Sequence, residues 1–175
     1  MTRKELHEFL DHEVGRSFFQ GLSFFPERYA VWLFRKSQYH ASQKGMIHKI
    51  LKFFYSVRLN RLYGIVASPY ASIGKGLRFV HPTSIVIGSS VHAGRNLHVY
   101  QNVTLGGSRL GDARKGNQPT IGDDVTVFCG AAVLGKITVG NNVTVAANST
   151  LLSSVPDNAV CVGSPARIVL KKNKA

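Results

Sequence analysis

The chain has 175 residues, of which 44% are hydrophobic and 18% are charged, so it can bury one sizeable core and lacks the composition of a disordered protein. Its two cysteines are too few for a disulfide framework, which favours a reducing, cytoplasmic location, and no apolar run reaches the roughly 18 residues that a membrane-spanning helix needs. The net charge is +13, and no acidic residue occurs between Glu27 and Asp112, which favours an anionic partner.

Residues 1–62 have the apolar spacing of helices and predict an α-helical N-terminal region with three helices. The first has a T-x-x-E capping box at Thr2 and Glu5 and stops near Gly15. The second opens at Pro26, and Gly45 separates it from the third. The first residues are acidic and have no apolar segment of the kind found in signal peptides, so no signal peptide is expected.

The third helix has an apolar stripe flanked by basic residues, which are Lys44, Lys49, Lys52, Arg58 and Arg61. This pattern is typical of a helix that lies on an anionic membrane or faces a lipid-linked substrate. Packing on its own domain or on a neighbouring subunit requires the same stripe. Peripheral contact with the inner face of the membrane therefore stays open as an alternative to a purely cytoplasmic location.

From residue 63 onward the apolar period changes to six. The residues at this period form two runs, Ile73, Phe79, Ile85, Val91, Leu97 and Val103, and then Ile121, Val127, Val133, Val139, Val145 and Leu151. One six-residue unit cannot bury its apolar residue, but three units per turn stack into a triangular prism with a continuous core. The expected fold is mainly β, a parallel β-helix over residues 63–170 after the helical region, with a basic tail at 171–175.

Residues 105–119 interrupt the repeat. The period would place apolar residues at Arg109 and Lys115, and the segment is instead rich in glycine and polar residues. The two runs agree in phase across the 18 residues from Val103 to Ile121, and we interpret this agreement as fortuitous because the composition is wrong. We therefore expect a loop that leaves the prism.

Residues 66–169 resemble the hexapeptide-repeat acyltransferases, and in particular their serine-acetyltransferase-like branch. The stretches that carry the resemblance are IGKGLRFVHPTSIVIG at 73–88, NVTLGGS at 102–108, GAAVLGKITVG at 130–140 and VPDNAVCVGSPARIV at 155–169. The resemblance implies a left-handed β-helix, a homotrimer with its sites between adjacent prisms, and acetyl transfer from acetyl-CoA to a hydroxyl group.

The same resemblance implies roles for individual residues. His81 is the general base that takes the proton of the acceptor hydroxyl, a step suited to an imidazole that titrates near neutrality. Backbone N–H groups of Gly106 and Gly107 are donors to the oxyanion. Positions that match CoA contacts are Gly107, Ser108, Cys129, Ala147, Arg167 and Lys171, and candidate acceptor-side residues are His98, Asn117 and Gln118. No His, Cys and Asp cluster has metal-ligand spacing, so no metal is expected.

Four positions depart from the serine acetyltransferase pattern. Val66 and Val80 stand where the family has aspartates that orient the histidine, while Asn117 and Gln118 replace an Arg-His pair whose arginine grips an amino acid's carboxylate. These departures favour short capsule, exopolysaccharide or lipopolysaccharide O-acetyltransferases as the nearest group, with a sugar hydroxyl, or a lipid-linked saccharide, as acceptor.

Two alternatives to that main hypothesis remain open. One is serine O-acetyltransferase of cysteine biosynthesis, with Gln118 and an unidentified basic residue in place of the family's Arg-His pair. The other is a non-catalytic trimeric scaffold that keeps the prism without the chemistry. A nucleic-acid partner is not expected, because aromatic and basic residues are not interleaved on any face of the prism.

Overall fold

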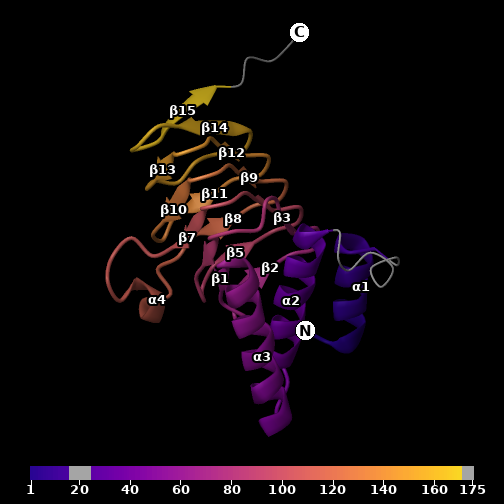
Figure 1. The fold of residues 1–175 in the computed structure, drawn as a ribbon. Helices are drawn as coiled ribbons and strands as arrows, with labels where there is room; N and C mark the ends of the chain where they lie inside the picture. Colours follow the sequence, from indigo (N-terminus) through magenta and orange to yellow (C-terminus); the bar gives the residue numbers. More distant parts are fainter. Residues whose placement is uncertain (16–24, 171–175) are drawn as a thin grey trace.

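The computed structural model describes residues 1–15 and 25–170, and places three helices against one end of a three-sided prism (Figure 1). The helices are α1 (Arg3–Glu13), α2 (Pro26–Ala41) and α3 (Met46–Tyr63). At the start of α1, the N–H of Glu5 donates to Thr2 Oγ1 at 3.2 Å and the N–H of Thr2 donates to Glu5 Oε2 at 2.6 Å. Both halves of the predicted capping box are thus confirmed.

In most turns of the prism, each of the three faces contains one short strand. These strands form three sheets, which are parallel except at the last strand. The first sheet contains β1 (Val66–Ala67), β4 (Val86–Ile87), β7 (Thr104–Gly106), β10 (Ala132–Leu134) and β13 (Thr150–Leu151). The second contains β2 (Ser72–Ile73), β5 (His92–Ala93), β8 (Thr120–Ile121) and β11 (Thr138–Val139). The third contains β3 (Arg78–Phe79), β6 (His98–Val99), β9 (Thr126–Val127), β12 (Thr144–Val145), β14 (Ala159–Val162) and the antiparallel β15 (Arg167–Leu170). This is the predicted left-handed parallel β-helix.

The first turn of the prism is longer than the sequence period suggested. Phe79 pairs with Val99, 20 residues later, whereas Val86 pairs with Thr104, 18 residues later. The corner that follows β3 therefore contains two extra residues. Phe79 and Ile85 are six apart but occupy different inward positions of their units, so the single phase expected from Ile73 to Val103 is wrong, although every predicted residue of that run is buried.

A second irregularity lies between β7 and β8. Leu105 pairs with Val133, 28 residues later, ten more than in a regular turn. The additional residues form a loop that contains the short helix α4 (Asp112–Lys115) and projects from the side of the prism (Figure 1). Because Val103 and Ile121 lie at different positions of their units, the agreement of the two sequence runs was fortuitous, as expected.

One hydrophobic core runs through the prism and into the helical region. Ala30, Leu33 and Phe34 of α2 are fully buried, and the ring of Phe34 packs edge-on against Phe79 at a centroid distance of 5.9 Å. Aromatic pairs of this geometry add stabilisation beyond the area they bury. The helices are thus packed on the prism through the same side chains that fill its first turn.

A buried ion pair also joins the helical region to the prism. Arg35 of α2 donates to both carboxylate oxygens of Glu13, at 2.6 and 2.9 Å, and neither side chain is exposed to solvent. The guanidinium also donates to the backbone carbonyls of Ile73 and Gly74, at 2.8 and 2.6 Å. Glu13 Oε1 in turn accepts the N–H groups of Gly76 and Leu77. Each charge is therefore satisfied on several sides, which is the condition for a stable buried pair.

A histidine pair lies where α2 packs on α3. The Nδ1 atoms of His40 and His48 are 2.8 Å apart, and the ring of Tyr55 stacks on His40. Burial lowers the pKa of His40 below its ordinary value of 6.5, and the charges of His48 and Lys36 lower it further. The folded protein then binds this proton less readily than the unfolded chain, so stability is lost as the pH falls below 6.5 toward the lowered pKa.

We therefore expect Tm to fall when the pH is lowered from about 7.5 to about 5.5, and the fall to be smaller in His40→Gln. Differential scanning calorimetry of both proteins at the two pH values measures the difference. The exposed His92 provides the matched control, since His92→Gln should behave like the unsubstituted protein. An equal loss of Tm in all three proteins would show that the histidine pair is not the cause.

Candidate active site

His81 lies at the corner between β3 and β4, where the two extra residues are found. Its backbone has a φ of 54°, a left-handed conformation that is uncommon for a side chain of this size, and the N–H of Thr83 donates to its carbonyl oxygen at 2.8 Å. The imidazole is exposed and faces the edge of the Tyr100 ring at a centroid distance of 6.2 Å. The longer corner thus presents His81 on the outside of the prism.

Later turns place other predicted residues on the same edge of the prism. The N–H of Gly130 donates to the carbonyl of Gln101 at 3.0 Å, and the N–H of Asn148 donates to that of Cys129 at 2.9 Å. These bonds stack Gln101, Cys129 and Ala147 in successive turns along the edge that begins at His81. The structure therefore brings His81, Cys129 and Ala147 into one column.

An aromatic pair lies beside this column. Tyr100 and Phe128 are half-buried, and their rings pack at a centroid distance of 4.7 Å. Below them, His98 on β6 pairs with Arg78 on β3. Burial lowers the pKa of the His98 imidazole, and the charge of Arg78 lowers it further. His98 thus lies on the face of the prism next to the His81 corner.

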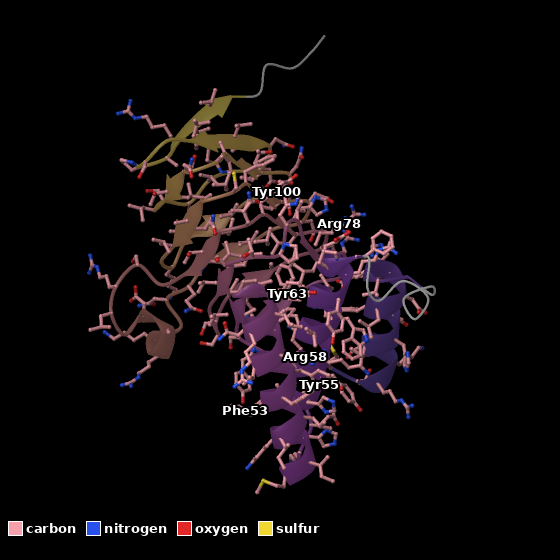
Figure 2. The ribbon with its side chains drawn as sticks, viewed as in Figure 1. Phe53, Tyr55, Arg58, Tyr63, Arg78 and Tyr100 are labelled. Atoms are coloured by element: carbon pink, nitrogen blue, oxygen red, sulfur yellow. The ribbon has the colours of Figure 1, made fainter. Side chains whose placement is uncertain are left out.

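The loop residues lie on a different edge. Gly106 ends β7, so Gly107 and Ser108 leave the prism between the first and second sheets, and Asn117 and Gln118 return to that edge. Figure 2 shows Arg78 close to the helical region and Tyr100 farther along the prism, while the α4 loop projects from the other side of the prism. One chain therefore does not bring Gly106 and Gly107 together with His81.

Two of the candidate acceptor-side residues hold the loop in place. Gln118 is buried, and its Oε1 accepts the N–H of Ser90 at 2.6 Å. Its side-chain amide occupies the space where a side chain on Gly88 would have to fit. Asn117 donates from Nδ2 to Asp112 Oδ1 at 3.2 Å. Within one chain, Gln118 Oε1 and Asn117 Nδ2 thus hold the loop in place.

Sequence reasoning missed Asp112, which organises the loop. Its Oδ2 accepts the N–H groups of Ser108 and Arg109, at 3.0 and 2.7 Å, and Gly107 leaves room because a Cβ there would lie 2.5 Å from the Asp112 Cβ. The hydrogen bond from Asn117 is the largest of the effects that lower the pKa of Asp112, followed by the bond from the Arg109 N–H. The available signal was that Asp112 is the first acidic residue after the long acid-free stretch.

Removing this carboxylate should release the loop. We expect Asp112→Ala to be cleaved by trypsin within the loop roughly tenfold faster or more, because hydrogen bonds to a charged acceptor are lost and local opening becomes easier. Limited proteolysis with mass spectrometry would locate the cuts at Arg109, Arg114 or Lys115. Asp11→Ala, at an exposed position on α1, is the matched control. Equal cleavage rates in the two variants would contradict the assigned role.

The closing segment is only partly described. Arg167 begins β15, where it pairs with Val162 and is exposed at the end of the prism. Lys171, the other cation assigned to the CoA phosphates, lies outside the described residues. Among the residues that the structure describes, no group of three or more His, Cys, Asp or Glu side chains could hold a metal ion, and no helix is long and apolar enough to cross a membrane.

A cleft of about 560 Å³ opens beside His81. It lies between the end of α1, the start of α2 and strand β3, and its lining includes Glu27, Arg28, Arg78 and Pro82 as well as His81. The charged residues of this lining were not identified from the sequence as site residues. They come from segments about 50 residues apart in the chain, a convergence that depends on how the helices dock.

Comparisons with known proteins agree with this geometry. Residues 118–153 match the bacterial transferase hexapeptide (six repeats) family. A serine acetyltransferase from Bacillus subtilis (strain 168) is 34% identical over 180 residues, covering 99% of this chain and 78% of that protein. A solved serine acetyltransferase in complex with CoA has 27% identity and a TM-score of 0.80, covering 95% of this chain and 71% of the other. The Neisseria gonorrhoeae serine acetyltransferase in complex with serine has 28% identity and a TM-score of 0.81, covering 95% and 70%.

These relatives correct the main hypothesis drawn from the sequence. The expected affiliation with short capsule and exopolysaccharide enzymes, and with it the sugar hydroxyl as acceptor, is contradicted by similarity to serine acetyltransferases along almost the whole chain, helices included. The residues at 117 and 118 were misleading because they pack the loop in this structure and so say little about the acceptor. The chain belongs to the serine acetyltransferase family of hexapeptide-repeat acyltransferases.

Proposed function

We propose that the protein is a serine O-acetyltransferase that transfers the acetyl group of acetyl-CoA to the hydroxyl of L-serine, with His81 as general base. The observation that carries the proposal is an exposed histidine on the edge of the prism, beside a cleft, in a chain similar over its whole length to serine acetyltransferases. Solved relatives bound to CoA and to serine support both substrates.

The chemistry assigned to His81 is the transfer of one proton from the serine hydroxyl to the CoA sulfur in two steps, the first of which is coupled to attack on the thioester. The imidazole takes the proton of the serine hydroxyl while the oxygen attacks the acetyl carbonyl carbon of acetyl-CoA. When the tetrahedral intermediate collapses, the carbon–sulfur bond breaks and the imidazolium returns the proton to the CoA sulfur. In the described part of the chain, no side chain donates to or accepts from the His81 ring, so we assign its orientation to a neighbouring subunit or to the bound acceptor.

A homotrimer would complete the site. The His81 column and the Gly106–Gly107 segment lie on different edges of one prism. When identical prisms pack side by side about a threefold axis, the His81 edge of one chain can face the loop edge of the next. In that arrangement the loop N–H groups stabilise the oxyanion, and Gly107, Ser108, Cys129 and Ala147 lie along the CoA groove, with Arg167 and Lys171 toward its phosphates.

Thiol release from acetyl-CoA tests the proposal directly. The purified protein should release CoA thiol with L-serine and not with saccharide acceptors at equal concentration. Sedimentation under the same conditions should show a trimer. No release with L-serine would reject the proposed function. The membrane contact expected from the basic α3 helix finds no support in the relatives and stays a prediction.

A further inference from the structure

Three charged side chains, besides that of Glu13, line the cleft beside His81. Arg78 of β3 and Glu27 and Arg28 of α2 line it, and none of the three makes an ion pair with another described residue. Arg28 lies over the ring of Phe25 at 4.7 Å, and its guanidinium donates no hydrogen bond to a described residue. Glu13 also lines the cleft, but Arg35 occupies its carboxylate.

The position of these charges is tied to that of the base. Arg78 lies three residues before His81, and the intervening chain is the end of β3 and the start of the corner. Its charge reaches the neighbouring His98, where it contributes to the lowered pKa. Figure 2 shows Arg78 where the prism meets the helical region, which is where α2 brings Glu27 and Arg28.

This charge pattern matches one class of acceptor. A hydroxy α-amino acid carries a carboxylate and an ammonium group within a few bonds of its hydroxyl, so the groups that bind all three must share one cleft. A guanidinium binds a carboxylate through a planar fork of N–H donors, and a carboxylate is a natural partner for an ammonium group. The lining supplies two cations, one anion and the base together.

We propose that this cleft binds the acceptor as a zwitterion, with Arg78 and Arg28 on its carboxylate and Glu27 on its ammonium group. The inference rests on the proposed function and assigns specificity to residues that the family resemblance does not mark. Arg78 and Arg28 would bind the acceptor's carboxylate in place of the family's arginine, which is absent at the positions of Asn117 and Gln118. These three residues are specificity determinants, whereas His81 performs the chemistry.

Steady-state kinetics with paired acceptors tests this assignment. Arg78→Met should raise KM for L-serine about 10- to 100-fold, as expected when a hydrogen bond to a charged group is lost, while KM for acetyl-CoA stays unchanged. Arg28→Met should act in the same direction. Ethanolamine lacks the carboxylate and 3-hydroxypropionate lacks the ammonium group. Arg78→Met should therefore affect 3-hydroxypropionate but not ethanolamine, and Glu27→Gln should do the reverse.

The matched control is Arg95→Met, at an exposed arginine whose partner is Asp123 and which lies outside the cleft. A second readout is independent of turnover, since L-serine should raise Tm of the unsubstituted protein and not of Arg78→Met. If the protein acetylates L-serine and the cleft variants keep its KM within about twofold, the inference is overturned and the proposed function stands. If no variant or parent accepts L-serine, the proposed function itself fails.

Discussion

Replacing His81 by alanine is expected to reduce kcat for acetyl transfer by about 10²- to 10⁴-fold, the usual contribution of a positioned general base. The hydroxyl of serine is a weak nucleophile until its proton is taken, and in the described residues no other imidazole lies on the same corner. Neither the prism nor the column above His81 depends on its exposed side chain, so Tm and KM for acetyl-CoA should change little.

The control for this experiment is His92→Ala. His92 is also exposed and lies on a strand of the prism, but its Nδ1 contacts the carbonyl of Ser90 on a different face. It should keep full activity. The pH dependence of kcat/KM adds a test of role, because removing the base should abolish the limb of the profile that reports its deprotonation. An active His81→Ala protein with an unchanged profile would exclude His81 as the base.

The fold was predictable because the six-residue apolar repeat can be recognised in the sequence. A unit of six cannot bury its inward residue alone, so the regular recurrence of such residues predicts that the units stack, and Val127 and Val139 are indeed buried. The length of a corner is less visible. Two extra residues near His81 shift the phase of the repeat without breaking the six-residue spacing between Phe79 and Ile85, so periodicity alone could not reveal them.

The site was predictable only in part. His81 is marked by a motif, whereas Cys129 and Ala147 are marked only by the family resemblance, and the structure stacks both in the column that begins at His81. Glu27 and Arg28 could not be found in this way. Their approach to His81 depends on how α2 docks on the prism, and that docking is fixed by contacts between residues far apart in the chain. Helical periodicity shows which face of α2 is apolar, but not what covers it.

The docking itself can be tested at the buried pair of Glu13 and Arg35. Glu13→Gln is expected to lower the free energy of unfolding by about 3–5 kcal/mol, because it leaves the Arg35 charge buried without its partner. The substitution also replaces one of the two carboxylate oxygens by an NH2 group. Oε1 accepts the N–H groups of Gly76 and Leu77, and Oε2 accepts from Arg35, so at least one of these contacts is lost. Urea unfolding followed by circular dichroism measures the change.

A double substitution distinguishes the cost of an uncompensated buried charge from the cost of altered side-chain packing. In Glu13→Leu with Arg35→Met no charge is left buried, so the loss of stability should be well below the sum of the two single effects. The matched control is the exposed pair of Arg95 and Asp123, whose removal should change stability little, because water screens an ion pair at the surface. If Glu13→Gln behaved like the exposed pair, the ion pair would not be what holds the helices to the prism. Because Glu13 also lines the cleft, the contact that docks the helices also forms part of the wall of the cleft.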